Sequence, residues 1–254
     1  MTALTPAIAY QVRQPPPHLA EFIESYWSVT CISDIPKNVV VMPDGRVDLH
    51  FFSSPHEPYH AALAGLECEL SPVTVMPGSR LTSVSFKLLA MEYVLGSSVA
   101  HLLDDRMLVD PAEWGICMAD AADFDVFCGK LNDKISSLVK PGVDERKRRM
   151  FDLIYSSKGS ATVADIADAA QWSSRQINRY FNQWFGMSLK AYCSILRFRA
   201  SLVQIKEGKF YPEDFYFDQA HFIKDIKKYS GMTPKELHKN RDDRFIQLLA
   251  LKKP

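Results

Sequence analysis

The residues from Gln171 to Gly186, QWSSRQINRYFNQWFG, combine large aromatic side chains with side chains that form paired hydrogen bonds. At helical spacing the aromatic residues share one face, and the opposite face carries Ser174, Arg175, Asn178, Arg179 and Asn182. Arginine can bind guanine through two donors, and asparagine can bind adenine in the same bidentate way. The pattern predicts a helix that reads DNA bases, although a solvent-exposed helix of another helical domain would show the same polar face.

Two helix-start signals place this segment in a helix-turn-helix arrangement. Thr162 is followed three residues later by Asp165, and Ser173 is followed by Gln176, so each pair can form a capping box. Gly186 is placed to end the second helix in a left-handed conformation. Two short helices joined by a tight turn present the second helix to the major groove of DNA.

The net charge of zero conceals a division of the chain. Residues 146–254 contain 21 Lys and Arg against 11 Asp and Glu, a net charge of +10, whereas residues 1–145 contain 9 against 19, a net charge of −10. The basic part has the electrostatic footprint of a nucleic-acid binder, and the acidic part could cover it in the absence of an effector. Lys140-Pro141-Gly142 stops a helix at this division, so we expect an N-terminal domain over 1–141 and a C-terminal domain over 142–254.

From Thr162 to about Lys239 the sequence resembles the DNA-binding domain of the AraC/XylS family of bacterial transcription regulators. The resemblance lies in Ile166-Ala167, in SSRQINRYFNQWFGMSLKAYCSILRFRASL and in DQAHFIKDIKKYSGMTPKEL, which contains the family's Gly-x-Thr-Pro signature. It implies an all-helical domain of two helix-turn-helix motifs, bridged here by a long helix from Leu189 to Glu207. It also implies DNA contacts by the five polar residues above and, in the second motif, by Gln219, His221, Lys224 and Lys228.

The second motif departs from the family pattern. Phe210-Tyr211 replaces the usual Ile-Ala pair, Phe215 stands where glycine is usual, and Pro212 can begin a helix but cannot lie within one. We therefore expect the leading helix of this motif to be short, shifted or absent. One hypothesis is that the first motif reads bases while the second binds phosphates. The alternative is a ligand-binding or protein-interaction module whose second motif no longer reads DNA.

The first half predicts a β-rich domain with short helices, and hence an α+β fold for the whole chain. NVVVMPDGRVDLHFF and SPVTVMPGSRLTSVSFKLL each contain two apolar runs around a turn signal, Asp44-Gly45 or Pro77-Gly78, and predict hairpins. We expect a short helix within PPPHLAEFIESYWSV, short helices between 88 and 115, and a helix over 120–139. HLAEFIESYW and MPDGRVDLHFF also resemble the N-terminal domain of some AraC-type regulators, which implies effector binding or dimerisation.

Several polar residues of the first half are candidates for chemistry. His50, His56, Glu57 and His60 could form a metal site, but the prolines around them favour an exposed turn, so we expect no metal and no cofactor. A second group consists of Asp44, Arg46 and Asp48. In one interpretation these residues form a charged cluster that lines a pocket. In the other, Asp44 stabilises the turn and Arg46 forms an ion pair with an acid.

The first half shows no sign of catalysis. It lacks GxSxG, P-loop and GxGxxG motifs, and the sequence places no histidine beside Cys68 or Cys117. We therefore expect that the protein is not an enzyme. Phe22, Tyr26 and Trp27 fit a helix packed on the β-rich core, and the alternative is that they line an apolar ligand pocket.

Composition and residue pattern favour a cytoplasmic protein. No apolar run approaches the ~20 residues of a membrane span, the N-terminus lacks the pattern of a signal peptide, and the five cysteines form no CxxC pair.

We expect a sequence-specific DNA-binding transcription regulator that recruits or blocks RNA polymerase at promoters. An unidentified signal at the N-terminal domain, such as a small-molecule effector, would control it, and the family resemblance adds homodimerisation as an option.

Overall fold

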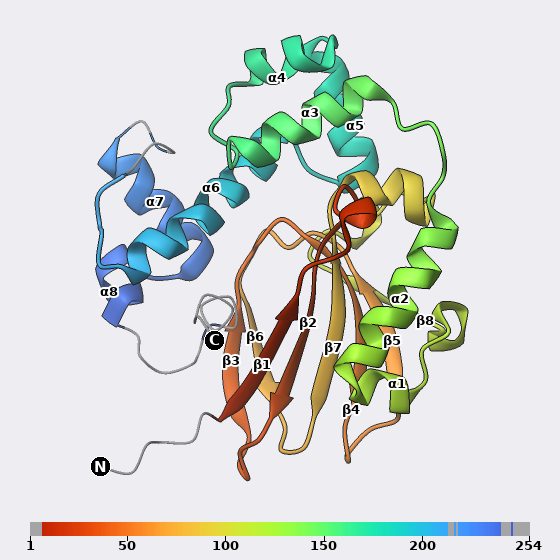
Figure 1. The fold of residues 1–254 in the computed structure, drawn as a ribbon. Helices are drawn as coiled ribbons and strands as arrows, with labels where there is room; N and C mark the ends of the chain where they lie inside the picture. Colours follow the sequence, from red (N-terminus) through yellow and green to blue (C-terminus); the bar gives the residue numbers. More distant parts are fainter. Residues whose placement is uncertain (1–6, 213–215, 217, 240–244, 246–254) are drawn as a thin grey trace.

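The computed structural model describes residues 7–212, 216, 218–239 and 245, and it confirms the α+β fold class (Figure 1). A six-stranded sheet has the order β1-β2-β7-β4-β5-β8, and a two-stranded sheet pairs β3 with β6. All pairings within both sheets are antiparallel. The strands are β1 (Ile8–Arg13), β2 (Ile23–Cys31), β3 (Lys37–Val41), β4 (Val47–Ser53), β5 (His60–Ala64), β6 (Ser71–Val75), β7 (Arg80–Phe86) and β8 (Arg106–Val109).

Helices follow the strands along the chain and dominate its second half (Figure 1). The short ones are η1 (Pro17–Leu19), η2 (Met91–Leu95), η3 (Ala100–Leu102) and η4 (Pro111–Trp114). The α-helices are α1 (Met118–Ala122), α2 (Phe124–Leu138), α3 (Glu145–Ser156), α4 (Val163–Ala170), α5 (Ser174–Phe185), α6 (Leu189–Lys206), α7 (Gln219–Ser230) and α8 (Pro234–Lys239). Within the described residues, no helix is both long and apolar enough to cross a membrane.

The two faces of the six-stranded sheet have different roles, because side chains alternate along each strand. Tyr26 and Phe51 lie on the face covered by α2, where their rings contact Phe127 edge to face at 6.5 and 5.4 Å between centroids. Their neighbours Trp27 and His50 lie on the opposite face and line a cavity. One face therefore forms the core with α2, and the other is free to form a binding site.

The sequence-based assignment of the first half is wrong at three points. Asp44-Gly45 does not close a hairpin, because β3 pairs with β6 while β4 pairs with β5 and β7. Pro77-Gly78 likewise joins strands of different sheets. Ile23 to Trp27 of FIESYW are strand rather than helix, because β2 is paired on both sides, with β1 and β7. Turn residues mark a change of direction, but they do not determine which strands pair.

The other expected elements of the first half are found with modified boundaries. The helix expected over 120–139 is divided into α1 and α2 at Asp123, whose carboxylate accepts the backbone N–H groups that begin α2. Of the segment 88–115, η2, η3 and η4 are helical, but β8 is a strand.

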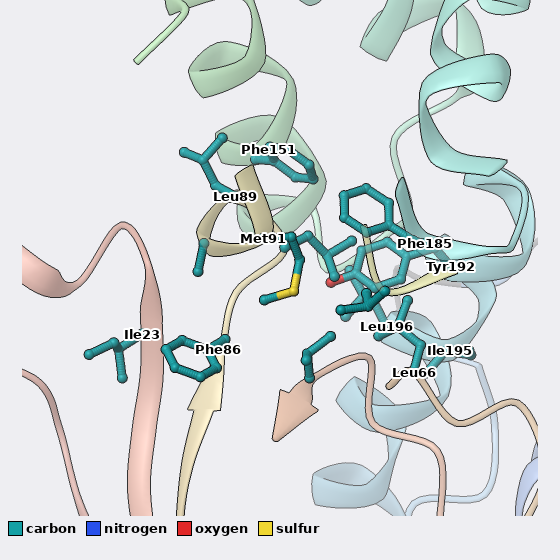
Figure 2. Packing of buried hydrophobic residues seen from close by; sticks show 14 of the residues in the cluster. Ile23, Leu66, Phe86, Leu89, Met91, Phe151, Phe185, Tyr192, Ile195 and Leu196 are labelled. Carbon is teal, nitrogen blue, oxygen red and sulfur yellow. The ribbon is translucent and has the colours of Figure 1, made fainter. Parts of the chain in front are cut away.

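A single cluster of buried hydrophobic residues runs from the sheets into the helices of the second half. Figure 2 shows members of this cluster from both halves, with Met91 drawn between Phe86 of the first half and Phe185 and Tyr192 of the second. Phe151 on α3 and Phe181 on α5 have ring centroids 6.1 Å apart. The two halves are thus packed together through apolar side chains, and α3 of the second half contacts the first, where the Tyr155 hydroxyl accepts the backbone N–H of Leu88 at 3.0 Å.

Candidate nucleic-acid interface and ligand cavity

Both predicted capping boxes form. The Thr162 hydroxyl accepts the backbone N–H of Asp165 at 3.1 Å and begins α4. The Ser173 hydroxyl accepts the backbone N–H of Gln176 at 3.3 Å, and the Gln176 side chain accepts the Ser173 N–H at 2.8 Å. The reciprocal bonds satisfy N–H groups that the first turn of each helix leaves open, so local sequence determines where α4 and α5 begin.

The apolar face of α5 anchors the helix in an aromatic cluster. Phe181 and Phe185 are buried, with ring centroids 5.2 Å apart, and both contact Phe151 of α3. Phe181 also lies 5.8 Å from the ring of Tyr192 on α6. Because packed aromatic rings bury large areas, this face holds α5 firmly and leaves its other face outward.

The outward face of α5 carries the five residues predicted to contact DNA. Ser174, Arg175, Arg179 and Asn182 are exposed, and Asn178 is half-buried. Asn178 and Asn182 donate one amide hydrogen each to their own helix, to the carbonyl oxygens of Ser174 and Asn178, at 3.0 and 2.7 Å. Within the described part of the chain, neither arginine has a hydrogen-bond or ion-pair partner, so both guanidinium groups are available to an external ligand.

The N-terminal half holds the opposite end of α5. The backbone N–H of Val99 donates to the Trp184 carbonyl at 2.9 Å, and the Ser98 hydroxyl donates to the Gln183 carbonyl at 2.7 Å. Gly186 ends the helix at φ 75°, and a Cβ there would lie 2.6 Å from the Ala100 carbonyl oxygen. The first half therefore contacts the C-terminal end of α5 and leaves its N-terminal turns open.

The second motif is less complete than the first. The bridging helix forms as predicted, as α6, with Glu207 as its C-cap. Among the described residues between α6 and α7, none is helical, in agreement with the expectation of a short, shifted or absent leading helix. Phe215 lies outside the described residues. The Gly-x-Thr-Pro signature begins α8, where the Thr233 hydroxyl accepts the backbone N–H of Glu236.

The four second-motif candidates lie on or near one helix but are mostly engaged within the protein. The Gln219 amide donates to the Phe210 carbonyl at 3.4 Å, and the His221 ring lies 3.6 Å from the Asp225 carboxylate. The Lys228 ammonium donates to the Tyr229 hydroxyl at 3.1 Å. Lys224 is exposed, and the described residues offer it no hydrogen bond or ion pair.

Among the described residues, three ion pairs connect acids of the first half to bases of the second. Arg148 on α3 pairs with Glu21 at 2.6 Å, Lys147 on the same helix pairs with Glu92 at 2.5 Å, and Arg199 on α6 pairs with Glu24 at 2.6 Å. Burial, the largest single influence, would raise the pKa of Glu24, but the charge and hydrogen bond of Arg199 and the charges of Arg46 and Lys87 together outweigh it and lower that pKa. The opposite charges of the two halves thus meet at α3 and α6 and do not cover the exposed face of α5.

A cavity of about 420 Å³ lies between the two sheets. This volume falls within the range of small-molecule sites. Its charged and aromatic lining comes from the six-stranded sheet and from connections between strands, whereas the β3–β6 sheet contributes apolar and small polar residues, among them Val41, Val73 and Val75. The lining includes Tyr10, Trp27, Val41, Asp44, Arg46, Asp48, His50, Phe52, Glu57, His60, Glu67, Val73, Val75, Met76, Leu81 and Arg106.

Both interpretations of the Asp44, Arg46 and Asp48 group are confirmed. The Asp44 carboxylate accepts the backbone N–H of Arg46 at 3.1 Å and pairs with its guanidinium at 2.9 Å. All three residues also line the cavity. The Arg46 guanidinium reaches the hydroxyls of Ser25 and Ser85 at 3.4 Å, and Ser85 donates to Asp48. The Nε of Arg46 is buried without a hydrogen-bond partner.

The cavity changes the ionisation of several groups. Burial, with Asp44 nearby, raises the pKa of Asp48 to about 6, and burial with both of these acids nearby raises the pKa of Glu67 to about 8. Burial lowers the pKa of His50 to about 4, with the Arg106 charge acting in the same direction. Negative charge is therefore costly in this cavity, because two carboxyl groups lack sufficient compensation.

The histidine-rich segment of the first half does not converge on one point. His50 bonds the Ser83 hydroxyl at 2.9 Å, His60 bonds the Pro58 carbonyl at 3.0 Å, and His56 is exposed. Across the described residues, no group of three or more His, Cys, Asp or Glu could hold a metal ion. Each of the five cysteines is a free thiol.

One loop joins the cavity to the helices of the second half. Gly45 lies between the cavity residues Asp44 and Arg46, and its carbonyl accepts the hydroxyl of Tyr192 on α6 at 3.0 Å. Gly45 has φ 77°, and a Cβ there would lie 2.9 Å from Leu196 Cδ2. The sequence analysis missed the Gly45–Tyr192 contact, because neither residue type nor spacing indicates a pairing across 147 positions. It also missed the position of Glu67 in the cavity lining.

Comparison with known proteins adds a limited result. Residues 11–108 match a domain of unknown function, DUF6597, which is less than half of the chain. No curated protein matches the chain. ToxT from Vibrio cholerae is similar at 10% identity over 91% of this chain and 97% of that chain, with a TM-score of 0.45. ToxT bound to an unsaturated fatty acid is similar at 12% identity, over 93% and 96%, with a TM-score of 0.38.

Proposed function

We propose that this protein is a sequence-specific DNA-binding transcription regulator of the AraC type, controlled by a small-molecule effector in the cavity of its N-terminal half. Residues 1–141 would form the sensor domain, and residues 142–254 the DNA-binding domain. Control would act on recruitment or exclusion of RNA polymerase at a promoter. Homodimerisation through the first half remains part of the proposal on the strength of the family resemblance alone.

The observation that carries the proposal is the exposed face of α5. Its aromatic face is fixed in the core, its N-terminal turns are open, and Arg175 and Arg179 have no partner within the described chain. Such an arrangement matches the requirements for base readout in the major groove. Lys224 on α7 would add a phosphate contact, which supplies affinity without reading sequence.

The test is binding of the full-length protein to the DNA upstream of its own gene and to an unrelated duplex, measured by fluorescence anisotropy over a range of salt concentrations. We expect preference for the upstream DNA and a steep loss of affinity with salt, because bound lysines and arginines release counterions. Arg175→Ala should cost about 1–3 kcal/mol and relax the preference for one base pair.

Lys130→Ala is the matched control, because it removes one positive charge from α2 and breaks only an exposed ion pair with Asp120. Its DNA affinity should equal that of the wild type. Equal and weak binding to both duplexes, or an Arg175→Ala variant that behaves like Lys130→Ala, would contradict base reading by α5.

A second candidate function is a ligand-binding or protein-interaction module that no longer reads DNA. The observation in its favour is the second motif, where the described residues before α7 are not helical and Gln219, His221 and Lys228 contact other parts of the protein. This candidate predicts DNA binding that is weak and independent of sequence, so the same anisotropy measurement separates the two.

A further inference from the structure

The carboxylate of Glu67 is the starting point. It lines the cavity from the connection between β5 and β6, and within the described chain it has no hydrogen bond or ion pair. Asp44, Asp48 and Asp104 act on it with like charge, and Arg106 opposes them more weakly. A half-buried carboxylate in this position is stabilised by a positive charge that the protein itself does not supply.

The arginine in the cavity does not supply that charge. Arg46 pairs with Asp44 and also bonds Ser85, which in turn bonds Asp48. Its charge is therefore already shared between two aspartates. An anionic ligand that approached the free Nε of Arg46 would have to enter beside Asp44 and Asp48, and like-charge repulsion opposes this.

The remaining basic groups leave the balance negative. His50 is held neutral, since burial and the Arg106 charge lower its pKa to about 4. Arg106 is exposed and forms no ion pair with Glu67. The lining as a whole contains four acids (Asp44, Asp48, Glu57 and Glu67) against two arginines.

The rest of the lining suits an apolar body with a cationic end. Val73 and Val75 of β6, together with Met76, form an aliphatic side of the cavity. Trp27 and Tyr10 add aromatic surface next to the acids. Aromatic faces attract ammonium and guanidinium groups and do not attract carboxylates.

We propose that the cavity binds an amphiphilic organic cation, with its amine or ammonium group held by Glu67 and Asp48 and its apolar body against the β3–β6 sheet. This proposal rests on the function proposed above only in treating the cavity as the effector site. A cation bound there favours the ionised form of Glu67, so binding at neutral pH releases a proton.

The test uses three probes that share one chain and differ in head group: octylamine, octanoic acid and 1-octanol. Isothermal titration calorimetry on the full-length protein at neutral pH measures the affinity of each. Repeating the amine titration in buffers with different ionisation enthalpies measures the protons released. We expect octylamine to bind about ten-fold or more tightly than octanoic acid, which corresponds to about one charge interaction in a partly buried site.

Glu67→Gln is the decisive variant, because it removes the charge while keeping the shape of a side chain that has no partner to lose. It should lower the affinity for octylamine about ten-fold and abolish the release of a proton on binding, while the affinity for 1-octanol stays unchanged. Glu69→Gln is the control, since it removes the same charge from an exposed position two residues away. Its titrations should match those of the wild type.

Three results would overturn the proposal: octanoic acid binding as tightly as octylamine, Glu67→Gln leaving the amine affinity unchanged, or no binding of any of the three probes. The anisotropy measurement on the same samples keeps the two proposals separate. Cation binding without sequence preference for DNA would contradict the proposed regulator function and support the proposed cation site. Sequence-specific DNA binding without cation binding would support the regulator function and contradict the cation site.

Discussion

At the scale of single residues, Glu67 makes the stability of the fold depend on pH. Burial and the neighbouring Asp44 and Asp48 raise its pKa to about 8, above the ordinary 4.5. Between these two values the folded protein retains a proton that the unfolded chain has released. The contribution of this bound proton to the free energy of unfolding is complete below the pKa of the unfolded chain and is lost as the pH rises through the pKa of the folded protein.

Glu67→Gln should remove this dependence, because the amide stays neutral at every pH. The free energy of unfolding of the variant, relative to the wild type, should rise by at most about 1.4 kcal/mol per pH unit between the two pKa values. Urea unfolding of both proteins across this window measures the difference. A variant curve parallel to the wild type would contradict the assignment, and the exposed Glu69→Gln is expected to give such a parallel curve.

At the scale of elements, the proposed function predicts unequal contributions to DNA binding from the motif that contains α5 and the motif that contains α7. In the first motif α5 begins at a capping box and presents free arginines, whereas in the second the residues described before α7 are not helical. Base contacts need a precisely oriented helix, but phosphate contacts tolerate more freedom. We therefore expect single base substitutions to cost about 1–3 kcal/mol in the half-site bound by α5 and much less in the other.

Binding of full-length protein to a set of singly substituted operators measures this asymmetry. Lys224→Ala provides the complementary variant. It should lower the affinity for all operators by the same factor and reduce the salt dependence of that affinity, as loss of a phosphate contact does. Equal sensitivity to base changes in the two half-sites would show that α7 also reads bases.

The elements also show why some parts of the fold could be predicted and others could not. The boundaries of α4 and α5 depend on bonds within three residues, such as Ser173 with Gln176, so the local sequence contains them. The pairing of β3 with β6 joins Lys37 to Val75, and no local signal specifies such a partner. FIESYW was expected to be helical, because its aromatic residues fit either a helix or a strand until β1 and β7 are placed beside it.

The candidate sites follow the same rule. The face that we expect to contact DNA could be placed from the sequence, because all five of its residues lie on one helix, α5. The cavity was only partly predictable: Asp44, Arg46 and Asp48 are close in sequence, but Glu67 and Trp27 reach them through the sheets. A binding site assembled from several strands depends on pairing, which is the part of the fold that local sequence does not specify.

At the scale of the whole molecule, the loop at Gly45 offers a route from the cavity to α6 and α5. Asp44 and Arg46 face the cavity, while the carbonyl between them accepts the hydroxyl of Tyr192 on α6. Tyr192 is buried and its ring contacts Phe181 on α5. A change in the charged pair can therefore reach α5 through packed groups in direct contact, which is the physical requirement for coupling two sites.

A double-mutant cycle tests this route without an effector. Asp48→Asn alters the charge balance around Arg46, and if the cavity is coupled to α5 it should change the affinity for the upstream DNA by about 5-fold or more. In a Tyr192→Phe background the same substitution should have little effect, because the hydrogen bond to the Gly45 carbonyl is gone. Tyr192→Phe alone should cost about 1–3 kcal/mol of stability, since it leaves a buried carbonyl without its donor.

Tyr93→Phe is the matched control, because it removes another tyrosine hydroxyl that bonds a backbone group between the halves, the N–H of Asp144 at 3.0 Å, away from the cavity loop. In that background Asp48→Asn should act on DNA affinity as it does in the wild type. An effect of Asp48→Asn that persists with Tyr192→Phe would show that coupling bypasses Gly45. No effect in any background would show that the charge of the cavity does not reach α5, even though a continuous core joins the two halves.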